Sequence, residues 1–425
     1  MSAGQGARGA AGRAPAVVDG SAGAGDPGPA GAAGTTGRGR RLADVDALRA
    51  FALLGILVVN VWAFADPYYA TASGNPAFDG PVDHTVRFVV AALFETKFYL
   101  LFSFLFGYSF TLQMASAERD GVSFVGRMLR RVLGLAVLGA VHGVALYSGE
   151  ILVVYAGLAL VLLVARNMTL RRAVVLGSAL LAAVAVLWVG LGVLQLAAGY
   201  AAAPPGAGAG EALAKATAFG GDAGEAFAFT AGHRAEVVAA IVLLQGPSAL
   251  AMFFFGFAAG RHELFTRALP RAVVRWSLGL GLTLGLAGGA FYAWTVVRAP
   301  GGGLETLAFG VGQLTAPFLT AAYVVGCLAL FRRSRRVRDS IAPTGRMALT
   351  GYVGQSAVLA VVFTGYGLGL VDQVAPTVVL GLVAVVFAAQ LVLSRWWLGR
   401  HVYGPLEWAL RWVTNGRRPR WRASR

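Results

Sequence analysis

The sequence predicts an all-α fold, a polytopic bundle of about ten transmembrane helices with both termini in the cytoplasm. Of the 425 residues, 57% are hydrophobic and only 13% are charged, whereas about a quarter of a soluble domain is charged. Several apolar runs exceed the roughly 18 residues that cross a bilayer as a helix. The basic residues stand between these runs, which is the arrangement that orients membrane helices.

The apolar runs follow one another from Leu42 with short breaks. Because only helices and closed barrels satisfy their backbone hydrogen bonds in lipid, continuous runs of this length predict helices. Glu95 and Lys97 interrupt the second run, which is alternatively an interfacial turn before a span near 98–114. The ten runs cover residues 47–65, 88–113, 130–147, 150–166, 173–197, 236–260, 273–297, 305–331, 347–368 and 374–394.

The charge distribution predicts the orientation of the bundle. With the N-terminus inside, most of the 36 Lys and Arg residues fall in inner segments, as the positive-inside rule requires. The outer loops are instead acidic, with Asp66, Asp79, Asp83, Glu211, Asp222, Glu225 and Asp372. We therefore interpret the net charge of +16 as a topology signal and not as a nucleic-acid-binding surface. The expected location is the cytoplasmic membrane of a bacterium, and the expected partner is the lipid bilayer.

Composition divides the chain into five segments. The N-terminal tail is too poor in large apolar side chains to fold, and the loop after the fifth run, which begins with small residues, is expected to form a flexible cap over the outer face. The segments are a disordered cytoplasmic tail (1–41), N-terminal membrane helices (42–197), an extracytoplasmic loop (198–235), a C-terminal membrane region (236–415) and a basic tail (416–425).

Three ionisable residues in and around the third run are candidates for function. Arg131 and His142 are eleven residues apart, which places them about 16 Å apart along a helix and nearly on the same face. With Arg131 at the inner rim, His142 would lie near the middle of the membrane and Glu150 near the outer rim. Ionisable groups at mid-membrane usually face a partner, cavity or path. The alternative is an anchoring arginine, a packed histidine and a loop carboxylate.

Further polar residues lie near the ends of the runs. Asp46 and Arg49 are three residues apart at the start of the first run, so they can pair on one helix face. Arg127, Arg130 and Arg131 cluster at the inner mouth of the third run. A single cysteine, Cys327, excludes disulfides and cysteine-based metal clusters, and phosphate-binding loops, zinc-protease and hydrolase motifs do not occur. The sequence therefore predicts neither a metal nor a bound cofactor.

Five strings of the sequence form a familiar set, and the resemblance that they carry runs from about residue 42 to 415. They are DxLRxxALLGIxxxN from Asp46 to Asn60, KFYLLFSFLFG at 97–107, RRxLxLxxLGxxHG…GEIL at 130–152, GRMALTxYxxQS at 345–356 and GPLEWxxR at 404–411. They resemble the YeiB-like family of bacterial integral membrane proteins, whose C-terminal part is described as domain of unknown function 418. Glu150 stands where this family usually has aspartate, and Gly351 stands where asparagine is common.

That family is similar to multi-pass membrane acyltransferases of the acyltransferase-3 and heparan-glucosaminide acetyltransferase types. These proteins move an acyl group from cytoplasmic acyl-CoA to an acceptor at or beyond the membrane, with a membrane-embedded histidine at the centre. Arg131 and His142 match the arginine–ten residues–histidine pattern of acyltransferase-3 proteins. The resemblance thus implies acyl-CoA as a co-substrate and an envelope glycan or lipid as the acceptor.

Three functions remain open from the sequence. In an acyltransferase, His142 is the general base, Glu150 or Asp46 orients its imidazole, and Arg131, with Arg130 and Arg127, binds the CoA phosphates. In a small-molecule or proton-coupled transporter, the same polar groups form a path through the membrane. In a structural or sensing protein, His142 only packs.

Overall fold

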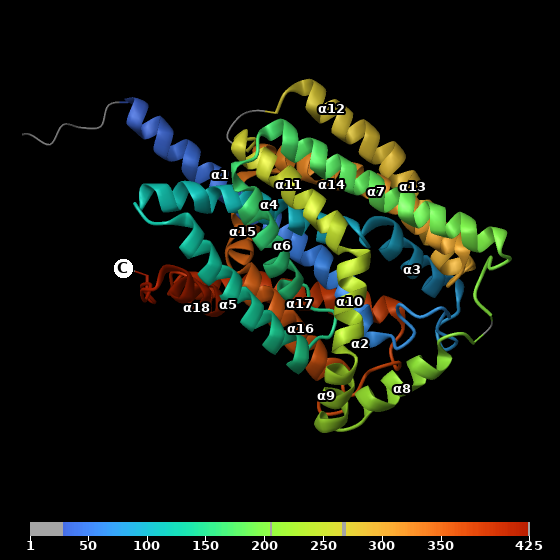
Figure 1. The fold of residues 1–425 in the computed structure, drawn as a ribbon. Helices are drawn as coiled ribbons and strands as arrows, with labels where there is room; N and C mark the ends of the chain where they lie inside the picture. Colours follow the sequence, from blue (N-terminus) through green and yellow to red (C-terminus); the bar gives the residue numbers. More distant parts are fainter. Residues whose placement is uncertain (1–28, 205, 266–268, 424–425) are drawn as a thin grey trace, which may run out of the picture.

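The computed structural model describes residues 29–204, 206–265 and 269–423, with side chains from residue 43 onward. Regular structure in these residues is helical, apart from an isolated β-bridge between His401 and Arg422. Figure 1 shows the helices as an elongated bundle. The first turns of α1 and the short α18 lie at one end, here named the α18 end, and α8 and α9 lie at the other, the α8 end. The all-α prediction is confirmed.

The helices of the first half run from α1 to α9. They are α1 (Pro29–Asn60), α2 (Trp62–Ala65), α3 (Pro81–Leu93), α4 (Lys97–Arg119), α5 (Phe124–Ala145), α6 (Leu152–Val164) with a 3₁₀ turn (Ala165–Asn167), α7 (Leu170–Ala197), α8 (Ala209–Gly220) and α9 (Ala223–Gly232). Ser123 and Thr169 cap the N-termini of α5 and α7 by accepting backbone N–H bonds, which satisfies donors that a helix start leaves free.

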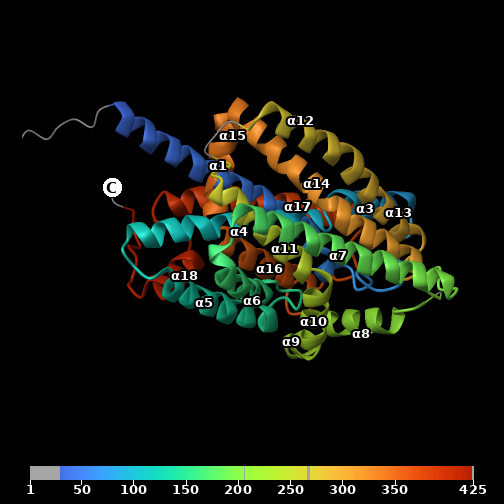
Figure 2. The same ribbon diagram turned by 45° about the horizontal axis from the view of Figure 1, so that its top comes forward.

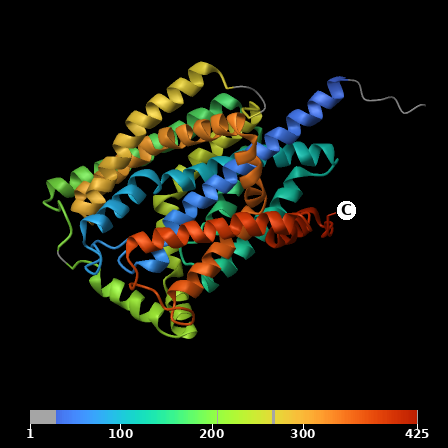
Figure 3. The ribbon, with the colours of Figure 1, turned by 180° about the vertical axis from the view of Figure 1, so that it is seen from behind.

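The second half contains the helices that follow. They are α10 (Arg234–Leu244), α11 (Gly246–Arg261), α12 (Arg271–Leu280), a π-helical turn (Gly281–Gly285), α13 (Leu286–Arg298), α14 (Gly303–Arg333), α15 (Arg335–Arg346), α16 (Ala348–Phe363), α17 (Pro376–Leu398) and α18 (Pro405–Asn415). In Figure 2, α12 lies along the flank of α14. Figure 3 shows the bundle from behind, with α17 on the near side beside α1.

The interior of the bundle is built around α4 and α11. A Cβ on Gly107 would overlap the backbone of Phe253, and one on Gly256 would overlap the backbone of Phe104. Glycine at both positions therefore lets the two helix backbones approach closely, as is common between membrane helices. Stacked rings of Phe106 and Phe253, 4.6 Å between centroids, complete this contact.

Membrane-spanning helices can be counted from length and hydropathy. Within the described residues, seven helical segments are long and apolar enough to cross a bilayer. The count rises to nine if two bent pairs, α9 with α10 (46°) and α15 with α16 (75°), are each one span. The apolar helix Leu152–Asn167 is shorter. The multi-pass character is thus confirmed, while ten spans and cytoplasmic termini stay predictions.

Three segments differ from the sequence-based expectation. The predicted run 236–260 is divided at Gln245 between α10 and α11, because its glycine and proline (Gly246, Pro247) permit a bend. The predicted flexible loop 198–235 contains the helices α8 and α9. The small residues of this loop do not prevent the two helices from forming. The predicted disordered tail 1–41 is helical from Pro29, and its first 28 residues lie outside the described part.

Candidate functional site

At the α18 end, Arg131 on α5 belongs to a group of arginines from four helices. Arg49, Arg411 and Glu407 are the charged groups that act on Arg131 together with its neighbour Arg127. The Nε of Arg131 is buried and has no hydrogen-bond partner among the described residues. We call Arg49, Arg131, Arg346 and Arg411 the arginine cluster. It is an electropositive, partly buried environment suited to an anion.

Asp46 lies within this arginine cluster. Its carboxylate accepts a hydrogen bond from Arg49 at 2.7 Å, and Arg49 also donates to the Ser109 hydroxyl at 2.6 Å. Arg346 and Arg411 lie within electrostatic range of the same carboxylate. The predicted Asp46–Arg49 pair is confirmed, and it places Asp46 at the end of the bundle where Arg131 lies.

The other two predicted phosphate ligands have structural partners. Arg127 forms an ion pair with Asp120 at 2.8 Å, and the Nε of Arg130 donates to the backbone carbonyl of Thr414 at 3.0 Å. The second contact ties α5 to the last turn of α18. Arg131 is therefore the member of the predicted arginine trio whose surroundings are those of the arginine cluster.

Glu407 joins the two most specific strings of the sequence, GRMALT and GPLEW. Its carboxylate accepts the backbone N–H groups of Leu349 (2.7 Å) and Thr350 (3.0 Å) and the Thr350 hydroxyl (2.6 Å). These are free donors in the first turn of α16, so Glu407 acts as a cap supplied by another helix. The arginine cluster is thereby fixed to the bend between α15 and α16.

Close packing of α15 on α1 explains the glycine of GRMALT. A Cβ on Gly345 would overlap the carbonyl of Asp46 and approach the backbone N of Ala50. Only a residue without a side chain allows this approach. The contact brings Arg346 to the same level as Asp46 and Arg49.

His142 lies in the last turn of α5, three residues before its end at Ala145, and thus toward the α8 end. Its side chain is 2% exposed, and both ring nitrogens are buried without a hydrogen-bond partner among the described residues. The ring packs near Tyr352 on α16, with 5.0 Å between centroids, and near Tyr147 at 6.2 Å. An unmade hydrogen bond of a buried group costs roughly 1–3 kcal/mol, and the described protein atoms supply no hydrogen bond to either nitrogen of this imidazole.

Glu150 is completely buried in the loop between α5 and α6. Its carboxylate accepts the backbone N–H groups of Leu152 and Val153, so it caps α6, and it pairs with Arg234 at 3.3 Å. Burial raises the pKa of Glu150, and these partners oppose that rise. Neither Glu150 nor Asp46 hydrogen-bonds His142, and the predicted catalytic trio is divided between the two ends of the bundle.

Arg234 is a residue that the sequence reasoning missed. At the start of α10, its guanidinium lies against the backbone of Gly143, beside His142, and donates to the carbonyl of Ser148 at 2.7 Å. It is 84 residues from Glu150 in the chain, so no local spacing connects the two. The available signal was an arginine in a loop whose charged residues are mostly acidic.

A small pocket that His142 itself does not line begins one turn farther along the chain. It has a volume of about 210 Å³, and Ala145, Leu146, Phe219, Phe227 and Ala360 are among its lining residues. Its wall is formed mainly by α5, α8, α9 and α16. Thr230, Thr364 and Tyr366 also line it, so its polarity is mixed.

A larger cavity of about 460 Å³ opens at the α8 end, and we call it the outer cavity. Its walls come from the segment 62–87, the end of α13, the start of α14 and the start of α17. Aromatic side chains line it together with carboxylates. The aromatic residues are Trp62, Tyr68, Tyr69, Phe78 and Tyr292, and the acidic ones are Asp66, Asp79, Asp83, Glu95 and Glu305.

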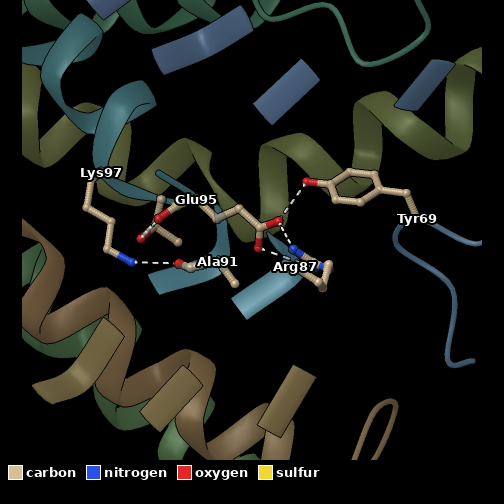
Figure 4. Close-up of polar contacts among 6 residues, drawn as sticks. Tyr69, Arg87, Ala91, Glu95 and Lys97 are labelled. Carbon is tan, nitrogen blue, oxygen red and sulfur yellow. Dashed lines mark hydrogen bonds and ion pairs between the residues drawn. The ribbon is translucent and has the colours of Figure 1, made fainter. Parts of the chain in front are cut away.

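The floor of the outer cavity contains a buried ion pair, shown in Figure 4. Glu95 binds Arg87 and accepts a hydrogen bond from the Tyr69 hydroxyl at 3.2 Å. Lys97, 1% exposed, donates to the carbonyl of Ala91 at 3.1 Å. Glu95 and Lys97 therefore have separate partners. Burial and the Glu95 charge raise the pKa of Tyr69 well above its usual value, so this phenol stays protonated.

Burial also shifts the pKa of the Asp66 carboxyl at the rim and of the Lys215 amino group beside it. The pKa of Asp66 is raised, although Tyr68 N–H (2.9 Å) and the Asn75 amide (3.0 Å) bind its carboxylate. The pKa of Lys215 on α8 is lowered to about 8, and its Nζ donates to the carbonyl of Asp66 at 3.4 Å. Desolvation is the main cause in both cases.

Comparison with known proteins gives a family match for part of the chain and similarity to uncharacterised proteins, but no activity. Residues 259–417 match the family described as "Protein of unknown function (DUF418)". This region contains the GRMALT and GPLEW strings, whereas His142, Glu150 and Asp46 precede it.

Three curated relatives extend the similarity over most of the chain. Uncharacterized protein YxaH of Bacillus subtilis (strain 168) is 28% identical over 88% of this chain and 94% of its own length. Uncharacterized protein YeiB of Escherichia coli (strain K12) is 27% identical over 88% and 96%. An uncharacterized 39.9 kDa protein in the amylase 3′ region of Bacillus acidopullulyticus is 25% identical over 89% and 95%.

Proposed function

We propose that this chain, a membrane protein similar to YeiB with a DUF418 region, transfers an acyl group from cytoplasmic acyl-CoA. The acceptor is a glycan or lipid in the cell envelope. His142 is the general base of this reaction. Arg131 and the arginine cluster bind the phosphates of coenzyme A.

The observation that carries the proposal is the buried imidazole without partners. Both nitrogens of His142 are inaccessible and unbonded among the described residues. A histidine retained only for packing would gain stability from a hydrogen bond or from an apolar replacement. A neutral imidazole with a free nitrogen can instead accept a proton from a substrate hydroxyl that comes within hydrogen-bond reach.

The transfer is balanced without a cofactor. The acceptor hydroxyl gives its proton to the imidazole as its oxygen attacks the thioester carbonyl, and a carbon–oxygen bond forms. The carbon–sulfur bond then breaks, and the imidazolium returns the proton to the thiolate of coenzyme A. The guanidinium of Arg234, which lies beside His142, is a candidate for stabilising the negative charge on the carbonyl oxygen.

The distance between the two ends of the proposed site suits acyl-CoA. Arg131 and His142 are separated by about 16 Å along α5, a gap that an extended pantetheine arm bridges between its phosphates and its thioester. Arginine binds phosphate strongly because its planar donors match the phosphate oxygens. The acyl group then points toward the pocket one turn beyond His142.

The test uses the full-length protein in inverted membrane vesicles and radiolabelled acetyl-CoA. We expect label in the envelope fraction with the wild-type protein and none above background with His142→Ala. The matched control is His262→Ala, at an exposed histidine, which should retain full transfer. Undiminished transfer by His142→Ala, in protein that folds and inserts normally, would remove His142 from the mechanism.

A transporter is the second candidate, and the two bent helix pairs favour it. Transporters often bind substrates where helices are discontinuous, and α9–α10 and α15–α16 bend by 46° and 75°. Proteoliposomes separate the two functions. Proton-coupled solute uptake without any release of coenzyme A would support the transporter and contradict the acyltransferase.

A further inference from the structure

The outer cavity is a separate site from the one proposed for acyl transfer, and its chemistry can be argued independently. It is formed by residues of α2, α3, α13, α14 and α17 and the loops that join them, whereas His142 and Arg131 lie on α5. Its volume of about 460 Å³ falls in the range of small-molecule sites, roughly 300–1,000 Å³.

The charge of the outer cavity excludes anionic ligands. Among the described residues that line it, five carboxylates accompany one guanidinium, Arg87, and one imidazole, His84. Glu95 and Glu305 share Arg87 as their nearby cation. Such an excess of negative charge in a recess attracts cations.

Most of these carboxylates use only part of their hydrogen-bonding capacity. Asp83 accepts the backbone N–H of Gly80 at 3.2 Å, and Glu305 accepts that of Gly301 at 2.6 Å. A carboxylate can accept about four hydrogen bonds. Ammonium donors of a ligand can therefore bind these oxygens without displacing the contacts that fix them.

One residue of the cavity wall, Trp62, carries an unused donor. Trp62 is 4% exposed, and its indole Nε1–H is buried without a hydrogen-bond partner in the described part of the chain. Buried indole N–H groups normally find an acceptor. A hydroxyl oxygen of a ligand would satisfy it.

The aromatic walls suit a cation as well. The guanidinium of Arg87 already lies 5.2 Å from the centre of the Tyr69 ring, so this ring face is directed toward positive charge. Further rings in the walls, including Tyr292 and Phe78, offer faces of the kind that bind ammonium groups.

We propose that the outer cavity binds a small hydroxylated organic amine in its cationic form. The carboxylates select the positive charge, and the Trp62 N–H binds a hydroxyl oxygen. A phospholipid head group fits less well, because its phosphate would meet the acidic lining. The proposal stands whether or not the protein transfers acyl groups.

The experiment compares three probes that share a six-carbon polyol chain and differ in charge. N-methylglucamine is a cation, sorbitol is neutral and gluconate is an anion. Binding to the full-length protein in nanodiscs is measured by isothermal titration calorimetry at pH 7 and low salt. We expect N-methylglucamine to bind at least tenfold more tightly than sorbitol, and gluconate not to bind.

Two variants test the assigned residues. Glu305→Gln keeps an oxygen for the Gly301 N–H but removes the charge, and it should weaken N-methylglucamine binding about fivefold or more. Trp62→Phe keeps a ring and removes the donor, and it should weaken binding roughly three- to tenfold. Glu236→Gln, an equal charge change at an exposed residue outside the cavity, should leave binding unchanged.

Thermal unfolding of each variant identifies protein that has failed to fold, and such a variant is replaced by Asp83→Asn. Equal binding of sorbitol and N-methylglucamine would overturn the cationic assignment. Binding of gluconate, no binding of any probe, or unchanged affinity in Glu305→Gln would equally overturn the proposal.

Discussion

Glu95 and His142 are both ionisable side chains buried among the helices, but the bundle accommodates them in opposite ways. Glu95 has Arg87 and the Tyr69 hydroxyl as partners, whereas both nitrogens of His142 have none among the described residues. A buried charge with a full set of partners is part of the architecture. The imidazole without partners is the feature on which the proposed acyl transfer rests.

The largest expected effect on stability is at Glu95. Glu95→Ala leaves the Arg87 charge without its carboxylate partner, and removing one member of a buried pair costs about 3–5 kcal/mol. Thermal unfolding in detergent should show this as a large fall in the melting temperature. Glu118→Ala, at an exposed residue, is the control and should have little effect.

The double variant sharpens this prediction. If the loss arises from the unpaired guanidinium, Arg87→Ala in the Glu95→Ala background should recover part of the stability. A double variant that is destabilised by the full sum of the two single changes would show that Glu95 and Arg87 act independently.

A smaller loss is expected at Glu407. Glu407→Ala removes three hydrogen bonds at the start of α16 and should cost about 1–3 kcal/mol. Glu407→Gln keeps one acceptor oxygen and should lose less. Equal stability of all three proteins in chemical unfolding would mean that the carboxylate is not an effective cap.

The lowered pKa of Lys215, which lies on α8 outside the membrane-spanning helices, predicts that the stability of the protein depends on pH. Its pKa is lowered from 10.5 to about 8 by burial, so between these values the folded chain has lost a proton that the unfolded chain retains. Stability should therefore rise with pH in this window. Lys215→Met should remove that rise, which is measured as the difference between the wild-type and variant melting temperatures from pH 7.5 to 9.5. A constant difference would contradict the buried position of Lys215.

The smallest effect on stability is expected at His142. Because its nitrogens make no hydrogen bonds with the described residues, His142→Leu, a change of similar volume, should lower the free energy of unfolding by less than about 1 kcal/mol, or raise it because two unsatisfied buried polar atoms are lost. Circular dichroism melting in detergent measures this. A loss comparable to that of Glu95→Ala would mean that His142 is structural after all.

The sequence predicted the helical, multi-pass fold because long apolar runs have few alternatives in lipid. It also predicted contacts within one helix, such as Asp46 with Arg49, since helical spacing determines them. It did not predict Arg234 beside His142 or Glu407 on α16, because these contacts join segments far apart in the chain. The helices α8 and α9 were missed for a different reason: small residues resemble a flexible loop in composition, yet Ala-rich segments are good helix formers.

The most direct test of the central claim measures the release of coenzyme A from acetyl-CoA by the wild type and His142→Ala in nanodiscs with envelope lipids and glycans present. Cys327→Ser in both proteins removes the single cysteine from the thiol assay. The account predicts steady release by the first protein and none by the second. Equal release by two well-folded proteins would contradict it.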